Sequence, residues 1–447
     1  MAENVLIIGG GFAGLSAGYQ LKKKGIDFKL VEATDHWGGR CSVNHYDPEN
    51  PDFYVSVGPV FCEPQETTIQ GYLEEFGLAD QYYNIKDKVY GYYYNGKLNY
   101  IVDDGNLLHA LMGIKGLPKA LIPQGAKFLK NAMKERSKIV GPDFEGVGLE
   151  PISKYSIKEW GDKYAGPEVV DKLLGPLVHA VIIGRTDEIS IAHPLALLGG
   201  MQGLGQIKGS HHIVADALYN AIKENVRLNA PVEELIIEDG VAKGVKLENG
   251  ETILANTVLC CLDAENLLKV APNLPVEMVE ALKTVEYSST FVYAFKFDRR
   301  IVPDNFCMLM VPESEDSIIG TVFDENIQGL VSEPGTTMME IFTAGWKDSE
   351  LLPLSEEDRE KRIREECAKI WPEFATEGKC VSVARFDRAI CLEKQGQLDA
   401  IHKMAATYKD QVKNLYLAAE YRQLVSCAEG AMNYGVKIAE EIAEETK

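Results

Sequence analysis

A glycine cluster near the N-terminus has the spacing that binds the diphosphate of a dinucleotide. Gly9, Gly11 and Gly14 form a GxGxxG pattern, with Phe12 and Ala13 before the last glycine. The first glycine permits a tight turn, the second lets the backbone approach a pyrophosphate, and the third lets a helix pack closely on a strand. Free amides and the helix dipole then attract the phosphates. The pattern predicts a phosphate-binding loop.

An acidic residue follows at the place of a ribose acceptor. Glu32 closes an apolar run, residues 28–31, and precedes Ala33. A carboxylate at this position accepts hydrogen bonds from the hydroxyls of an adenosine ribose. Its charge would also repel a 2'-phosphate, so NADP is disfavoured at this site.

The elements around these residues form a strand, a helix and a second strand. Residues 5–8 are a short apolar run suited to a buried parallel strand, residues 13–24 have helical spacing, and Gly25 ends the helix. A lone GxGxxG is weak evidence in a chain with 40 glycines, but here its context is right on both sides. The alternative is a glycine-rich turn that binds nothing.

A tyrosine-rich segment comes later in the chain. Tyr90, Tyr92 and Tyr94 alternate before Asn95-Gly96, which predicts a hairpin with a two-residue turn. These tyrosines either line a ligand pocket or belong to an ordinary half-buried hairpin. Patterning also predicts helices over about 66–82, 105–135, 155–180, 209–224, 355–371 and 429–444, and strands over 226–228, 232–237, 242–245, 254–262, 290–297, 307–311, 338–343, 381–386 and 414–418.

The sequence gives little indication of a metal site or of a reactive thiol. His211 and His212 begin a helix without a carboxylate or cysteine at ligand spacing, so we interpret them as capping or surface residues and predict no metal site. Nine cysteines are scattered from Cys41 to Cys427 without a CxxC pair. They are typical of reduced, mostly buried thiols, and we expect a cytoplasmic protein.

Composition limits the classes of partner. The chain has 447 residues, with 46% hydrophobic and 25% charged, which predicts an ordered globular protein of about two domains. Its formal charge of -21 disfavours nucleic acid as a partner. The N-terminal residues lack the features of a signal peptide, and no apolar stretch of about 18 residues suggests a spanning helix, so a membrane is not required.

Further motifs follow the dinucleotide unit in order. Gly38, Gly39 and Arg40 come just after the second strand in VEATDHWGGRCS. Residues 53–58 precede Pro59, residues 230–232 open a strand-turn-strand, and LAAEYRQLVSCAEGAMNYG precedes the last helix. This ordered combination resembles the flavin-dependent amine oxidase superfamily, which includes protoporphyrinogen oxidases and phytoene-type desaturases.

The resemblance implies an FAD site and assigns its residues. Gly9, Gly11 and Gly14 would face the pyrophosphate, and Glu32 would bind the ribose. Gly39 and Arg40 would contact the phosphates and the ribityl chain, and Glu420 would contact the ribityl hydroxyls. Val232 would contact the adenine, and Gly58 and Pro59 would lie beside the isoalloxazine ring. The helix begun by residues 428–431, with Ala431 in its first turn, would direct its amides at the N1–C2=O edge. No cysteine or histidine has the context of a flavin attachment site, so FAD is expected to bind noncovalently.

Departures from the superfamily pattern bear on the substrate. Ala419-Glu420 replaces the usual Gly-Asp, residues 290–297 lack a lysine at the expected N5-side position, and the aromatic pair that cages an amine is missing. We therefore expect dehydrogenation of a mostly apolar small molecule, of porphyrinogen or polyene type, by hydride transfer to flavin N5, with no side chain named as base. The alternatives are amine oxidation, a non-redox FAD-dependent isomerase and a binding protein that has lost chemistry. The electron acceptor and the oligomeric state are left open.

The expected fold is α/β, with a Rossmann-like FAD-binding domain and an inserted α+β substrate domain. The FAD-binding domain is expected in three parts, residues 1–63, 206–272 and 404–447. The substrate domain would comprise residues 64–205 and 273–403.

Overall fold

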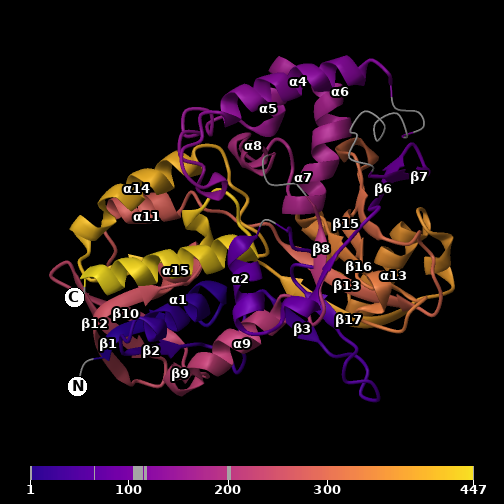
Figure 1. Cartoon of the computed structure of the whole chain (residues 1–447). Coiled ribbons are helices and arrows are strands. Elements are labelled where there is room, and N and C mark those ends of the chain that lie inside the picture. Colours follow the sequence, from indigo (N-terminus) through magenta and orange to yellow (C-terminus); the bar gives the residue numbers. More distant parts are fainter. Residues whose placement is uncertain (1–2, 65, 104–113, 115–117, 199–202, 446–447) are drawn as a thin grey trace.

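Two seven-stranded sheets and a helical layer make up the protein (Figure 1). The computed structural model describes residues 3–64, 66–103, 114, 118–198 and 203–445. In Figure 1 the first sheet lies at the lower left, the second at the right, and the helices α4 to α8 above both.

The first sheet carries the dinucleotide motif. Its order is β10-β11-β12-β1-β2-β9, and β18 also pairs with β12. Strands β2, β9, β12 and β18 continue the parallel arrangement of β1, whereas β10 and β11 form an antiparallel edge. The strands are β1 (Glu3–Ile8), β2 (Phe28–Val31), β9 (Val226–Arg227), β10 (Val232–Glu238), β11 (Val241–Leu247), β12 (Thr252–Cys260) and β18 (Leu415–Leu417).

Both faces of the first sheet are covered, which explains why β1 is an unbroken apolar run. Val5 and Ile7 point into one hydrophobic cluster, and Leu6 and Ile8 point into another on the opposite face. One cluster receives α1 (Phe12–Lys23), α2 (Thr67–Glu75), α9 (His212–Ile222) and α15 (Ala428–Glu445); the other receives α10 (Ala264–Val270), α11 (Val276–Leu282) and α14 (Gln397–Gln411).

The second sheet is mixed and has the order β17-β13-β16-β15-β14-β6-β7. Its strands are β6 (Val89–Tyr94), β7 (Lys97–Val102), β13 (Thr290–Phe297), β14 (Phe306–Met310), β15 (Ile319–Asp324), β16 (Thr337–Thr343) and β17 (Lys379–Phe386). Helix α13 (Glu356–Ala368) packs on one face through Ile363 and Cys367. On the other face Met338 packs against Tyr54 and Val55, so this face is turned toward β4 (Val55–Val57).

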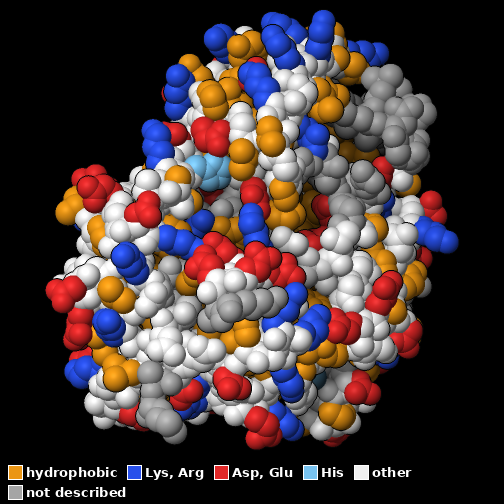
Figure 2. Space-filling view, turned by 60° about the vertical axis from the view of Figure 1, so that its left-hand side comes forward, with side chains coloured by type: hydrophobic (Ala, Val, Ile, Leu, Met, Phe, Trp, Pro, Cys, Tyr) orange, Lys and Arg blue, Asp and Glu red, His pale blue; other side chains and the backbone are white. Residues whose placement is uncertain are grey.

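The helical layer comprises α4 (Leu121–Arg136), α5 (Ile157–Tyr164), α6 (Pro167–Val169), α7 (Gly175–Ile182) and α8 (Ala192–Leu197). Phe128, Trp160 and Ile182 share its core. Figure 2 shows Lys and Arg side chains gathered over this upper part, and acidic side chains over the middle and lower parts. The negative charge is thus unevenly distributed. No helix in the described ranges is long and apolar enough to cross a membrane.

Small elements complete the chain. They are α12 (Asp348–Leu351) and the two-stranded pairs of β3 (Ser42–Asn44) with β4 and of β5 (Tyr82–Asn84) with β8 (Gly205–Ile207).

The predicted hairpin is confirmed, with Asn95 at φ +52° and Gly96 at φ +68° in its turn. The helix predicted over 66–82 is too long, because Gly77 at φ +71° stops it and β5 begins at Tyr82. The helical region 155–180 is interrupted at Gly166, whose φ is +112°. Most of residues 105–117, predicted as helix, lie outside the described residues.

The two sheets draw their strands from different parts of the chain. Every strand of the first sheet lies within residues 1–63, 206–272 or 404–447, and every strand of the second lies within 64–205 or 273–403. Helices α2, α11 and the start of α14 depart from this division, because Ile69, Met278 and Ile401 pack in cores of the first sheet. We propose the same two domains, with these three helices assigned to the first.

Two helical glycines test how closely α1 and α15 must approach. A Cβ at Gly435 would lie 2.2 Å from the Ala13 carbonyl oxygen, whereas a Cβ at Gly71 in α2 meets no atom within 4 Å. We expect Gly435→Ala to lower the free energy of unfolding by about 1–3 kcal/mol through overpacking. Gly71→Ala, the matched control, should raise it by about 0.5–1 kcal/mol. Urea unfolding of both variants measures this; equal effects would contradict the tight packing.

Candidate functional site

The predicted phosphate loop has the geometry that its glycines require. Gly9 adopts φ +105°, and a Cβ at Gly14 would lie 2.0 Å from the Gly9 carbonyl oxygen, so no larger residue fits there. Gly11 precedes α1 in extended conformation, and a Cβ on it would meet nothing within 4 Å. The start of α1 therefore presents backbone to an open space. Phe12 and Ala13 are buried in the first turn of α1.

The second glycine pair lies directly on this loop. The Gly38 amide donates to the Gly10 carbonyl at 2.9 Å, and a Cβ at Gly39 would lie 3.3 Å from the Gly11 Cα. Two glycine segments that are separate in sequence thus form one surface free of side chains. Such a surface lets the backbone approach a diphosphate closely.

A third glycine belongs to the same region. Gly58, followed by Pro59, has φ +141°, and a Cβ on it would lie 2.1 Å from the Arg40 carbonyl oxygen. The segment assigned to the isoalloxazine ring is therefore held against the segment assigned to the phosphates and ribityl chain.

The Glu32 side chain is positioned by backbone amides. One carboxylate oxygen accepts from the Gly10 amide at 2.7 Å, and the other accepts from the amide and hydroxyl of Thr34 at 2.9 and 2.8 Å. A carboxylate oxygen has lone pairs for further donors, so ribose hydroxyls can still bind. Ala33 lies between Glu32 and Thr34, in the same turn.

The segment assigned to the adenine is tied to Glu32. The Ala230 amide donates to the Glu32 carbonyl at 2.9 Å, and the Asn229 amide donates to the Thr34 carbonyl at 2.8 Å. Val232 begins β10 two residues later. The structure thus brings the predicted adenine and ribose contacts to neighbouring positions.

An arginine–glutamate pair links the two ends of the chain. The Arg40 guanidinium lies 3.1 Å from a Glu420 carboxylate oxygen and donates to the Ala389 carbonyl at 2.8 Å. Glu420 is 7% exposed, and its Oε1 has no hydrogen-bond partner among the described residues. A buried acceptor without a donor is costly unless a ligand supplies one. A ribityl hydroxyl is such a donor.

The closing helix begins next to this pair. The Ala431 amide donates to the Cys427 carbonyl at 3.0 Å, and the Gly430 amide lies 3.2 Å from the Cys427 sulfur. Ala431 thus closes the first turn, and the start of α15 carries the partial positive charge of its dipole.

Buried carboxyls lie in the second sheet and directly after one of its strands, β15. Glu340 in β16 is fully buried, and neither of its oxygens has a partner within the described part of the chain. Glu325 is 2% exposed and accepts from the Ser56 amide at 2.8 Å, two residues before Gly58. Burial raises the pKa of Glu325 to about 7; burial, and then Glu325, raise the pKa of Glu340. Sequence reasoning missed both, although Glu340 is the single acid in the apolar run MMEIFT.

An apolar cluster surrounds Glu340 on its sheet face. Phe323 pairs with Glu340 across the sheet, and Phe342 is two residues further along β16. Phe342 packs with Ile183 and Val292, and the partly buried Phe323, Ala384, Phe386 and Ile390 pack against this cluster. The face between β4 and the helical layer is therefore largely apolar, with carboxyls embedded in it.

The interpretation of His211 as a capping or surface residue is wrong. Its ring is 1% exposed, and its side chain makes no capping hydrogen bond to α9. It lies beside Cys62 and Glu66, so ligand-type partners exist in space. Sequence spacing could not show this, because these partners lie far away along the chain. His212, by contrast, is half-buried and lies 3.0 Å from the Cys41 carbonyl.

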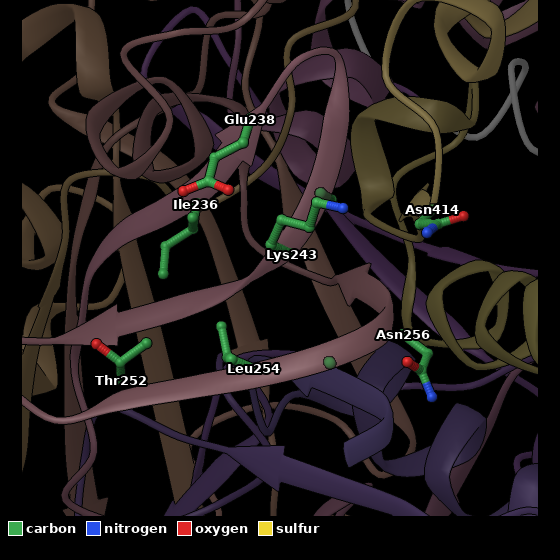
Figure 3. A pocket seen from close by; sticks show the side chains of 9 residues that line it. Ile236, Glu238, Lys243, Thr252, Leu254, Asn256 and Asn414 are labelled. Atoms are coloured by element: carbon green, nitrogen blue, oxygen red, sulfur yellow. The ribbon is translucent and has the colours of Figure 1, made fainter. Parts of the chain in front are cut away.

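A separate hollow of about 510 Å³ lies on the antiparallel edge of the first sheet. Figure 3 shows its lining side chains on β10, β11 and β12, with Asn414 beside them. The lining contains Glu238 and Lys243 but no cysteine or histidine. None of the predicted FAD-site residues lines it, so we do not assign it to the site.

A side-chain-free diphosphate surface and a ribose carboxylate beside a parallel sheet are typical of a dinucleotide-binding protein, and here an arginine paired with a buried glutamate lies in the same region. The family model of flavin containing amine oxidoreductases matches residues 12–443. The chain belongs to this family. The resemblance seen in the sequence motifs is confirmed.

The comparisons also give individual similarities. An L-amino acid oxidase of Cerastes cerastes is 24% identical over 294 residues, covering 64% of this chain and 56% of the relative. Wild-type putrescine oxidase bound to putrescine has a TM-score of 0.76 at 16% identity over 99% of both chains. A structure described as a protoporphyrinogen oxidase, from Exiguobacterium sp. 255-15, has a TM-score of 0.75 at 17% identity, covering 100% and 99% of the two chains.

These similarities support the fold and the family, and they leave the substrate open. The chain spans little more than half the length of the curated relative. The structural likeness, at such low identity, shows the shared fold alone. The substrate therefore has to be argued from the residues of this chain.

Glu32 provides a direct test of the cofactor site. We expect Glu32→Ala to weaken FAD binding at least about tenfold, because each charge-assisted hydrogen bond contributes about 1.5–3 kcal/mol. Titration of apoprotein with FAD, followed by flavin fluorescence, measures the affinity. Glu251→Ala, at an exposed acid of the same sheet region, is the control and should leave it unchanged. Equal affinities in both variants would remove Glu32 from the site.

The buried carboxyls predict a pH dependence of stability. A pKa raised in the folded state keeps the proton on the native protein, so the free energy of unfolding falls as pH rises through the interval between the unfolded and folded pKa values. For Glu325 this interval runs from about 4.5 to about 7, and for Glu340 it also begins near 4.5.

We expect Glu340→Gln to make this loss of stability smaller between pH 5 and pH 8, because a glutamine amide does not titrate there. Urea unfolding of the holoenzyme at several pH values measures it. Glu357→Gln, on the exposed start of α13, should match the wild type. A Glu340→Gln profile parallel to that of the wild type would contradict the buried, protonated state.

Proposed function

We propose that the protein is an FAD-dependent oxidoreductase that dehydrogenates a mostly apolar small molecule of porphyrinogen or polyene type. The observation that carries this proposal is the apolar cluster of Ile183, Val292 and Phe342, with Phe323 and Phe386 packed against it. Its sheet face is turned toward β4, which leads into Gly58 and Pro59. An apolar surface with a few polar groups suits a largely apolar substrate.

The residues of the chain would divide the work of holding the cofactor. Gly11 and Gly39 would accept the diphosphate, Glu32 the ribose, and Arg40 with Glu420 the ribityl chain. Bound FAD supplies a hydride acceptor at N5. The first turn of α15 would stabilise negative charge at the N1–C2=O edge, as helix N-termini do.

We place the substrate on the face of the second sheet and not between the tyrosine hairpin and β13. The hairpin of β6 and β7 and the strand β13 belong to one sheet, with β16, β15 and β14 between them. Tyr92 is 2% exposed, and its hydroxyl donates to the Lys172 carbonyl at 2.7 Å. This favours the half-buried hairpin over a pocket-lining role for Tyr92. We propose instead that the substrate lies across the sheet face near Phe323 and Phe342.

Amine oxidation is a second candidate, and the buried carboxyls favour it. An ammonium group near Glu340 and Glu325 would favour the ionised forms of these carboxyls and gain a counter-charge from them. Lys296, in the strand expected to lack an N5-side lysine, pairs with Glu333 at 2.8 Å. It therefore has a structural partner of its own.

Anaerobic stopped-flow reduction of the bound flavin separates these candidates. We expect bleaching by porphyrinogens or carotenoid precursors and little by benzylamine or spermine, because the cluster offers apolar contacts. Product identification by mass spectrometry should show loss of two hydrogens. Rapid bleaching by an amine, with none by the apolar compounds, would contradict the apolar substrate and indicate an amine oxidase.

Two further outcomes bear on the redox role. A product isomeric with its substrate, formed without net electron consumption, would indicate an isomerase. Flavin left oxidised by every compound of the panel would indicate a binding protein. Either result would overturn the dehydrogenase proposal.

The cellular setting is proposed on the cysteines. All nine are free thiols, and six of them are buried. Thiols that stay unpaired are typical of a reducing compartment, so we propose the cytoplasm. The reoxidising electron acceptor, whether oxygen, a quinone or another compound, follows from measuring turnover with each in turn.

A further inference from the structure

Three side chains of metal-ligand type meet outside the proposed cofactor contacts. Cys62, Glu66 and His211 each offer one ligand atom, and these atoms all lie within 4.8 Å of one another. Cys62 and His211 are buried at 1% exposure each. A thiolate, a carboxylate and an imidazole are the three ligand types that zinc takes from proteins.

Rigid backbone holds the three residues. The Cys62 amide donates to the Gly205 carbonyl at 3.0 Å, and the Gly205 amide donates to the Cys62 carbonyl at 2.7 Å. The Glu66 amide donates to the Glu63 carbonyl at 3.1 Å, just before α2. His211 stands at the start of α9. Two segments that are distant in sequence therefore meet at a fixed place.

The histidine has the arrangement of a metal ligand. Its Nδ1 is buried and has no hydrogen-bond partner in the described ranges. Its ring also hydrogen-bonds to the Pro59 backbone, and this bond must use Nε2 because Nδ1 is unpaired. Metal-bound histidines commonly donate their second N–H to a carbonyl, which fixes the other nitrogen as a lone-pair donor. Burial lowers the pKa of His211 to about 4, so the ring is neutral at pH 7.

Acidic side chains surround the other two groups, Cys62 and Glu66. Glu66 Oε2 is buried and has no hydrogen-bond partner within the described residues. Burial, and then the carboxylates of Glu429 and Glu63, raise the pKa of Glu66 to about 8. Burial, followed by Glu66, Glu63 and Glu429, raises the pKa of Cys62. The field at this point is negative, and a divalent cation would offset it.

We propose that Cys62, Glu66 and His211 bind a zinc ion. The ion would neutralise one thiolate and one carboxylate, which leaves the buried site with no net charge. The sulfur and nitrogen ligands favour zinc over calcium or magnesium, which prefer oxygen. Three protein ligands leave the fourth tetrahedral position for water. Zinc would join the segment after Gly58 and Pro59 to α9, and this role does not depend on the substrate.

Metal analysis of the holoenzyme tests the site. Protein made without a histidine tag, exposed to zinc and passed through a desalting column, should retain about one zinc per chain by mass spectrometry. Zinc-edge X-ray absorption should show one sulfur at about 2.3 Å and nitrogen or oxygen ligands at about 2.0–2.2 Å.

Matched variants decide which residues are ligands. Cys62→Ser and His211→Gln should each lose at least about nine-tenths of the zinc, whereas His212→Gln and Cys307→Ser should retain it. Circular dichroism and flavin absorbance check that each variant is folded. Zinc absent from the wild type, a spectrum without sulfur, or zinc retained by both ligand variants would overturn the proposal. If a ligand variant fails to fold, the wild-type spectrum alone decides.

Discussion

Close contact between backbones, at positions where no side chain fits, is the constraint on which the site depends. A Cβ at Gly14 would collide with Gly9, one at Gly58 with Arg40, and one at Gly435 with Ala13. Each contact joins backbone to backbone and leaves no flexible side chain to move aside. The glycines therefore fix the relative positions of β1, α1, the Gly38–Gly39 segment and α15.

A second constraint is that a charged side chain taken out of water needs an opposite charge, a hydrogen-bond partner or a change of protonation. Arg40 and Glu420 compensate each other, and Arg40 also reaches the Ala389 carbonyl. Glu340 has no such partner among the described residues and retains its proton through its raised pKa. An ion pair lies in the region proposed to hold the cofactor, whereas Glu340, without a partner among the described residues, marks the face turned toward β4. A buried acid without a partner is expensive for the fold, and this makes it a good marker of a functional surface.

The sequence predicted what local spacing encodes. The glycine loop, Glu32, the hairpin turn at Asn95-Gly96 and α15 follow from short patterns whose physics is contained within a few residues. Helices α10, α11 and α14 were not predicted, although Asp263 caps α10 with its side chain and could have indicated it. The meeting of Cys62 with His211 and of Ser56 with Glu325 could not be predicted, because each depends on segments brought together only by the folded sheets. The assignments of all the site residues to FAD, with Val232, Glu420 and Ala431 among them, stay predictions.

The order of the strands has a consequence for synthesis on the ribosome. Strand β1 pairs with β12, and α1 lies beneath α15, so α1 is covered by a helix that is synthesised much later (Figure 1). Contacts so distant in sequence form slowly and leave apolar surface uncovered in the meantime. The nascent chain must pass Leu417 and most of α15 before this half of the molecule can close. Cofactor capture is thus a late event of biogenesis, and the cellular supply of flavin at that moment bears on how much chain reaches its folded state.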